Sequence, residues 1–174
     1  AAANNYNTVI GYGNLTCTCC PSCRNVVIGT TAGDHLGKCN GNAERNIIIG
    51  DVAGATLMSG EGNIFMGHYS TYGPAHYNAS CPGWECGNYN IVIGRSTTQN
   101  QRAGNANIAI GYDVELPITS GTGCSCQLVI GAGDDIRWLV GNSSGNVGIG
   151  TTNPDLPVTS GNTARLSVGI LSAY

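Results

Sequence analysis

Eight short apolar phrases of one design recur along the chain, separated by polar and glycine-rich stretches. Each phrase consists of Asn or Gln, two mostly apolar residues, an aliphatic residue or Met, and Gly. The apolar run is too short for a helix and is rich in β-branched side chains, which is typical of buried strands. No stretch has the 3.6-residue periodicity of an amphipathic helix, so the pattern predicts an all-β protein.

The phrases recur at a loosely constant spacing. Their glycines lie 18, 21, 17, 27, 17, 20 and 19 residues apart, and a repeat of this length indicates a solenoid. We therefore expect a β-solenoid (β-helix or β-roll) of about eight rungs. The repeat residues that define these rungs are Asn7, Gly11, Asn25, Gly29, Asn46, Gly50, Asn63, Gly67, Asn90, Gly94, Asn107, Gly111, Gly131, Asn146 and Gly150.

The chain is expected to form one repeat domain over residues 1–174. The rungs occupy residues 7–150, and residues 151–174 form a C-terminal segment that is a candidate subunit contact. Between the phrases we expect inserted loops at 12–24, 30–45, 68–89 and 112–126.

Each residue type in the phrase has an expected role. Asn is expected to take the left-handed conformation at one corner, and Gly turns the next corner without steric cost. Stacking should bury the last apolar position in a ladder, with a second ladder two residues earlier. The ladder residues are Ile10, Ile28, Ile49, Met66, Ile93, Ile110, Ile130 and Ile149.

The middle position of most phrases is apolar as well. Alternate side chains of a strand point to opposite faces, so a phrase that is apolar throughout must be covered on both sides. The interior of the coil supplies one cover, and the pattern favours further copies of the chain as the other, for example in a homotrimer. The alternative is a monomer whose own loops cover that face.

Apolar character continues toward both ends of the chain, from Asn7 to residues 168–171. Terminal rungs without a polar cap are sheet edges that accept further strands. We expect either that the ends are surfaces for end-to-end polymerisation or that the chain is one segment of a longer polypeptide.

Two families share parts of this pattern. The Asn-x-x-Ile-Gly units resemble the coils of trimeric autotransporter adhesin heads, and residues 145–154, Gly-Asn-Val-Gly-Ile-Gly-Thr-Thr-Asn-Pro, are similar to a stretch of phage tail fibres that precedes an intramolecular chaperone. Both resemblances imply a trimeric, extracellular, β-structured fibre that is adhesive or structural.

Charge and hydropathy narrow the range of partners. Seven basic and ten acidic residues, with no block of like charge, lack the basic patch of a nucleic-acid-binding protein. No apolar run approaches the roughly 20 residues needed to cross a bilayer. We therefore expect neither nucleic acid nor membrane insertion.

Nine cysteines in a chain of this size favour an oxidising, extracellular or cell-surface location. All lie between the apolar phrases, as expected for disulfides that close loops, and the odd number leaves one without a partner in the chain. The cluster at residues 17–23 has zinc binding as an alternative, and residues 81–86 resemble a small stapled loop. The disulfide candidates are Cys17, Cys19, Cys20, Cys23, Cys39, Cys81, Cys86, Cys124 and Cys126.

The longest insert combines aromatic rings with polar groups, as carbohydrate-binding loops do. Its candidate glycan-binding residues are Tyr69, Tyr72, His76, Tyr77 and Trp84. The alternative is that these rings form a satellite core or a subunit contact. Asn-x-Ser/Thr sequons make Asn14, Asn78 and Asn142 candidates for N-glycosylation, although about three are expected by chance in such a composition.

Catalytic motifs are absent from the sequence. His35, His68 and His76 have no neighbourhood resembling a nucleophile elbow or a metalloprotease helix, and the adjacent acids Asp134 and Asp135 suit a solvated turn or a calcium ligand better than an acid/base pair. We expect no cofactor, no metal and no enzymatic activity.

These observations predict a structural subunit of an extracellular fibre or filament that associates with copies of itself. The main alternative is a receptor-binding or adhesive tail-fibre or adhesin segment that recognises surface glycans, on the virion surface if the chain is a phage fibre. A weaker third candidate is a fibre that cleaves polysaccharides through carboxylates contributed by different chains.

Overall fold

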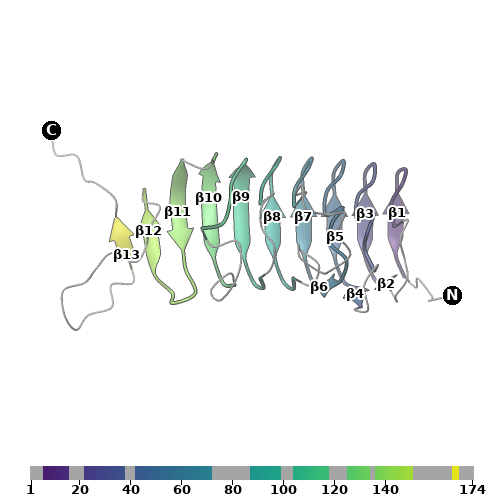
Figure 1. The fold of residues 1–174 in the computed structure, drawn as a ribbon, viewed down its shortest axis with the longest axis horizontal. Coiled ribbons are helices and arrows are strands. Elements are labelled where there is room, and N and C mark those ends of the chain that lie inside the picture. The colour runs from purple at the N-terminus through teal and green to yellow at the C-terminus, as the bar shows by residue number, and fades with distance from the viewer. Residues whose placement is uncertain are drawn as a thin grey trace.

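The chain forms a β-solenoid whose strands stand side by side in one long row (Figure 1). The computed structural model describes residues 6–15, 22–37, 42–71, 87–98, 104–117, 125–133, 136–150 and 166–168. None of these residues is helical, so the prediction of an all-β solenoid is confirmed.

A ten-stranded sheet runs the length of the row, with β1 at one end and β13 at the other (Figure 1). In spatial order its strands are β1 (Thr8–Ile10), β3 (Val26–Ile28), β5 (Ile47–Ile49), β7 (Ile64–Met66), β8 (Ile91–Ile93), β9 (Ile108–Tyr112), β10 (Leu128–Ala132), β11 (Arg137–Gly141), β12 (Val147–Ile149) and β13 (Leu166–Val168). A smaller sheet consists of β2 (Ser22–Cys23), β4 (Ala43–Glu44) and β6 (Gly60–Glu61).

The strands from β1 to β10 in the main sheet are parallel and in register, phrase upon phrase. Val27 pairs with Ile48, Ile48 with Phe65, and Phe65 with Val92. Since each phrase residue lies beside its equivalent in the next turn, side chains of the same kind stack from β1 to β10.

The middle residue of the second to seventh phrases points into the coil. Val27, Ile48, Phe65, Val92, Ala109 and Val129 are fully buried, whereas the flanking positions are half-buried or exposed. The expectation that Ile10 and its equivalents form the buried ladder is therefore wrong for the single chain. Successive side chains of a strand point to opposite faces. When the middle residue points inward, the residues on both sides of it therefore point outward.

The return segments of the coil cover these middle residues from the opposite side. Ala32 and Leu36 follow β3, Ala53 and Leu57 follow β5, and Val114 follows β9; all are fully buried in one core cluster with the phrase residues. The chain thus supplies its own cover for the inner face of the main sheet.

The continuous run of parallel strands is interrupted after β10, and parallel pairing recurs only between β12 and β13 among the described strands. Strand β11 pairs with β10 in the antiparallel sense, with a register shift at Ile130 and Gly131, and β12 pairs with β11, also antiparallel. The eighth phrase therefore does not stack on the seventh: Ile149 lies beside Leu139 of β11. The structure supports a solenoid of about five turns, and the expected count of eight equivalent rungs is not confirmed.

Three short strands lie between the phrases, where the sequence did not indicate strands. Strands β2 and β4 lie within the expected loops at 12–24 and 30–45, and β6 lies just before the fourth phrase. They pair in parallel with one another, so consecutive turns are hydrogen-bonded on a second side of the coil.

Candidate functional site

A column of buried asparagines, which we call the asparagine spine, runs through the solenoid. Each backbone N–H donates to the side-chain oxygen of the preceding Asn in the column, at 2.8–3.0 Å. The spine begins at Asn7 and its fully buried members are Asn25, Asn46, Asn63, Asn90 and Asn107.

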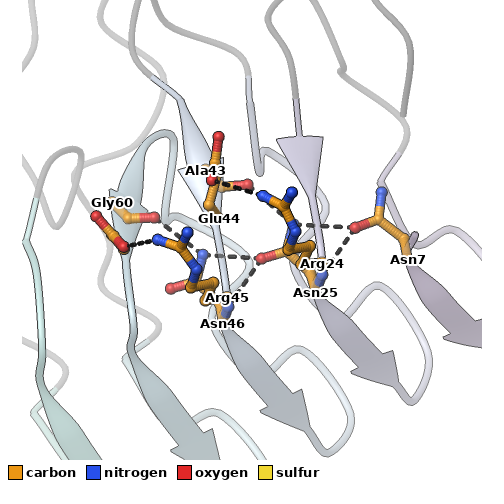
Figure 2. A network of polar contacts seen from close by, with 9 residues as sticks. Asn7, Arg24, Asn25, Ala43, Glu44, Arg45, Asn46 and Gly60 are labelled. Carbon is orange, nitrogen blue, oxygen red and sulfur yellow. Dashed lines mark hydrogen bonds and ion pairs between the residues drawn. The ribbon is translucent and has the colours of Figure 1, made fainter. Parts of the chain in front are cut away.

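Asn46 shows how completely one spine amide is bonded. Its Nδ2 donates to Oδ1 of Asn25 at 3.0 Å and to the carbonyl oxygen of Gly60 at 2.9 Å, contacts drawn in Figure 2. Its Oδ1 accepts from the backbone N–H and Nδ2 of Asn63, at 2.9 and 3.0 Å. A buried amide without partners would destabilise the fold, whereas this one joins three successive turns.

The left-handed corner lies one residue before the spine, which corrects the expected role of Asn. Arg24, Arg45, Tyr89, Ala106 and Cys126 have φ between 56° and 58°, and no spine asparagine has a positive φ. Asn is instead required for its side chain, because the amide supplies a donor and an acceptor to the neighbouring turns.

Two ion pairs link the same corners on the surface (Figure 2). Arg24 Nη1 lies 3.4 Å from Glu44 Oε2, and Arg45 contacts Glu61 of the following turn. All four side chains are partly exposed, so each pair contributes at most about 1 kcal/mol of stability.

The phrase glycines allow the turns to approach closely. From Gly11 to Gly111 their φ values lie between 125° and 144°, and a Cβ on Gly50 would lie 2.6 Å from the carbonyl oxygen of Gly67. Gly150 differs, with a φ of 65° and no atom within 4 Å of a Cβ built on it.

The outward face of the main sheet is apolar along its length. It carries the first and third residue of each phrase, which are stacked in register. Among these, Ile10 is 58% exposed, Ile47 and Ile93 are each 37% exposed, and Ile149 is 46% exposed. We call this surface the outer face.

Columns of exposed and half-buried residues border the outer face on both sides. The residues before the spine form the Asn-side edge: Tyr6, Arg24, Arg45, Gly62, Tyr89, Ala106 and Cys126. The residues after the phrase glycines form the Gly-side edge: Tyr12, Thr30, Asp51, His68, Arg95, Tyr112 and Ala132. An apolar strip bordered by tyrosines and arginines has the composition of a protein interface.

Most of the predicted glycan-binding residues lie outside the residues that the structure describes. Tyr69 is half-buried, and its ring lies edge-to-face on His68 with centroids 4.1 Å apart. Tyr72, His76, Tyr77 and Trp84 lie outside the described residues, so the expected cluster stays a prediction.

Most of the disulfide candidates also lie outside the described residues. Cys23 is half-buried and Cys126 is exposed, and no disulfide joins these two. The other candidates, Cys17, Cys19, Cys20, Cys39, Cys81, Cys86 and Cys124, lie outside the described residues.

Two of the three sequons can be placed. Asn14 is half-buried, and its Nδ2 donates to the carbonyls of Ile10 and Gly29 at 3.1 and 2.9 Å. A glycan on Nδ2 would remove one of these donors. Asn142 lies in the turn between β11 and β12, where its Oδ1 accepts from Ser144 and Asn146, and Asn78 lies outside the described residues.

Sequence reasoning missed a second polar column, two residues before the spine. The N–H of Glu61 donates to Oδ1 of Asn88, that of Asn88 to Oδ1 of Asn105, and that of Asn105 to the hydroxyl of Ser125, at 2.8–2.9 Å. The recurring Asn-x-Asn at 88–90 and 105–107 was the available signal.

The described residues contain no metal-ligand cluster and no membrane-spanning helix. In that part of the chain no group of three or more His, Cys, Asp or Glu side chains is placed to hold a metal ion, and no helix is long and apolar enough to span a membrane. Asp134 and Asp135 lie outside the described residues, and His35 and His68 each lie near one aspartate, Asp34 and Asp51.

No family model, curated protein or solved structure matches the chain.

Proposed function

We propose that this chain is a non-enzymatic structural subunit of an extracellular fibre or filament and that it associates with copies of itself. The observation that carries the proposal is the outer face. A monomer in water would leave a strip of half-buried and exposed aliphatic residues along the parallel strands of the main sheet, and strips of this kind mark association surfaces.

The internal bonding suits a load-bearing rod. Consecutive turns are joined by parallel strand pairs on one side, by the smaller sheet on another, and by the asparagine spine between them. The corners add regular backbone bonds, such as Val52 N–H to Thr30 O at 2.8 Å and Tyr69 N–H to Asp51 O at 3.0 Å. Separating two turns would break all of these bonds together.

The strand at the start of the row supports end-to-end growth. Among the described strands, β1 is paired with β3 alone, and its three residues are exposed. Such an edge strand can continue its ladder with another chain. In such a filament, the parallel strands of each subunit would extend those of the next.

The extracellular location rests on the cysteines. Mass spectrometry of the native protein without reduction tests it: intramolecular disulfides among the nine cysteines are expected. Nine free thiols, or a bound zinc ion, would contradict the disulfide proposal.

Electron microscopy of the native protein under non-reducing conditions tests the structural role. Long filaments with an axial repeat close to the length of the solenoid are the expected result, since ten strands at about 4.8 Å spacing span roughly 43 Å. Monomeric particles at every concentration would overturn the proposal.

An adhesive fibre segment is the second candidate. The contact between His68 and Tyr69 supports it, because it places an aromatic pair at the base of the aromatic insert. Retention of glycans on an array, lost on Trp84→Ala and Tyr72→Ala, would favour adhesion. Discrete rods that bind no glycan would count against it.

A further inference from the structure

The first and last strands of the described row point in the same direction. Strand β11 is antiparallel to β10 and β12 is antiparallel to β11, so two reversals return β12 to the direction of β10. Strand β13 then pairs with β12 in the parallel sense (Figure 1). Strand β13 at one end of the row is therefore parallel to β1 at the other.

Within the parallel run, each phrase bonds to the turn before it through the same two backbone groups. The carbonyl oxygen of Asn25 accepts from the N–H of Thr8 at 2.8 Å, and the N–H of Gly29 donates to the carbonyl oxygen of Ile10 at 2.9 Å. The next turn repeats both bonds, at 2.9 and 2.8 Å. Each phrase thus has a backward side, toward β1, and a forward side.

The eighth phrase keeps this polarity although its neighbour β11 is antiparallel. The carbonyl oxygen of Asn146 accepts from the N–H of Asn142, and the N–H of Gly150 donates to the carbonyl oxygen of Trp138, each at 3.1 Å. The Asn carbonyl and the Gly N–H again face backward, here toward β11. The forward side of β12 is therefore the side on which β13 pairs.

Strand β13 has the same polarity. Leu166 lies beside Val147 of β12 in the parallel pair. Because successive residues of a strand bond to alternate sides, it is Ser167 whose backbone groups face β12. The N–H and carbonyl groups of Leu166 and Val168 then face forward, as those of Thr8 do in β1.

Strand β1 presents the complementary side. The N–H of Thr8 and the carbonyl oxygen of Ile10 are bonded to β3, so the N–H and carbonyl of Val9 face backward. The side chain of Val9 is 43% exposed, whereas the equivalent middle residues from Val27 to Val129 are fully buried. A preceding turn would bond to this backbone and cover this side chain.

The sequence after β13 also suits a following turn. Gly169 follows β13 in the sequence, as Gly11 follows β1. A Cβ on Gly11 would overlap the carbonyl group of Gly29 in the next turn, so a phrase that is followed by another turn requires glycine at this position. The sequence at β13 meets this requirement.

We propose that β13 of one copy pairs in parallel with β1 of the next copy, with Ser167 beside Val9. The proposal rests on the end-to-end association proposed above and names the strand that β1 accepts. The N–H of Val9 donates to the carbonyl oxygen of Leu166, and the N–H of Val168 donates to the carbonyl oxygen of Val9. The parallel ladder of one subunit thereby continues in the next.

Proline substitutions block the two edges one at a time. Val168→Pro removes a forward-facing N–H of β13 and keeps the bonds of Ser167 to β12, and Val9→Pro removes the matching N–H of β1. Electron microscopy of either variant alone should show rods of one subunit length in place of filaments. Leu166→Pro, at the first position of β13, removes the other forward-facing N–H and should give the same result.

A mixture of the two variants tests which strands meet. Val168→Pro keeps an intact β1 and Val9→Pro keeps an intact β13, so each supplies the edge that the other lacks. An equimolar mixture should form rods about twice the length of one subunit and no longer. Rods of double length from Val168→Pro alone would show that β1 pairs with β1, and would overturn the proposal.

Val168→Thr, which keeps the N–H, is the matched control and should form filaments like the wild type. Circular dichroism of each variant checks that the β-solenoid is folded. Single rods from the wild type at every concentration would overturn both end-to-end association and the strand pairing. Wild-type filaments together with filaments of normal length from Val168→Pro and Leu166→Pro would overturn the pairing alone and leave end-to-end association standing.

Discussion

At the residue scale, the repeat is defined by two residue types whose roles depend on the neighbouring turn. The spine asparagines bond to the turns on both sides, and the phrase glycines face the carbonyl groups of the next turn. Each is placed by contacts about 17–27 residues away in the chain, not by the preferences of its own corner.

Gly50→Ala should destabilise the solenoid strongly. The new Cβ would lie 2.6 Å from the Gly67 carbonyl oxygen, and φ at this position is 137°. Backbone strain together with displacement of the next turn should cost about 3 kcal/mol or more of unfolding free energy. Chemical denaturation measures the loss.

Gly133→Ala provides the control for that substitution. Gly133 also has a positive φ, 75°, but a Cβ there meets nothing within 4 Å. We expect it to cost about 1 kcal/mol, the strain of the left-handed conformation alone. Equal losses for the two variants would contradict the argument from close approach.

Asn63→Asp should also destabilise the protein, although the side chain keeps its shape. At neutral pH the carboxylate cannot donate to Asn46 Oδ1 or to the Gly87 carbonyl, at 3.0 and 2.7 Å, and it leaves a buried charge. The expected loss of unfolding free energy is about 3 kcal/mol or more.

Asn105, which is exposed, provides the control for the Asn63→Asp substitution. Asn105→Asp keeps the oxygen that accepts from Asn88, and water solvates its charge. We expect a loss below about 1 kcal/mol. If the Asn63→Asp variant unfolds at the same denaturant concentration as the Asn105→Asp variant, the asparagine spine contributes little to stability.

At the element scale, a three-residue strand serves two interfaces at once. Its middle residue fills the coil and its flanking residues form the outer face. Asn stands two residues before the middle residue and Gly two residues after it. Because every second residue of a strand faces the same side, Asn, the middle residue and Gly all face the interior.

Adjacent substitutions in β8 should separate these two interfaces. Val92→Ser leaves a cavity and a buried hydroxyl in the core, and should lower the unfolding free energy of the chain by about 2–3 kcal/mol. Ile93→Ser, on the outer face, should leave the chain folded and weaken its association instead. Denaturation of diluted protein and sedimentation read the two effects separately.

One result would contradict this separation of the core from the outer face. If Ile93→Ser reduces the stability of the dissociated chain as much as Val92→Ser does, the outer face belongs to the fold of one chain and not to a contact between chains.

At the scale of the whole molecule, the two ends of the row differ. In the described part of the chain the parallel ladder starts with β1, whereas beyond β10 the antiparallel strand β11 interrupts it. A rod with unlike ends has a direction, so copies that add end to end would add head to tail.

Val9→Pro should block such growth without disturbing the subunit. The N–H of Thr8 donates to Asn25 O at 2.8 Å, so the N–H of Val9, one residue on, faces the open edge of β1. Proline removes that donor and keeps the bonds to β3. Filaments should shorten or disappear in electron micrographs.

Val9→Thr, which keeps the N–H, is the control and should form filaments like the wild type. Filaments of normal length from Val9→Pro would show that the open edge of β1 is not the growing end.

The sequence by itself determined the class of fold, an all-β solenoid. Glycine at each phrase end and β-branched triplets between corners favour short stacked strands, because neither feature suits a helix. It could not determine which face of an all-apolar triplet points inward, since alternation is equally compatible with both. Nor could it indicate β11, because the sequence around Trp138 carries no repeat phrase.

The tertiary structure decided those points through contacts between turns. Burial of Val27, Ile48, Phe65 and Val92 follows from the return segments that cover them, and the role of Asn follows from the amides above and below it. Both depend on residues that become neighbours only when the coil closes, and for that physical reason a local pattern specifies the repeat but not its orientation.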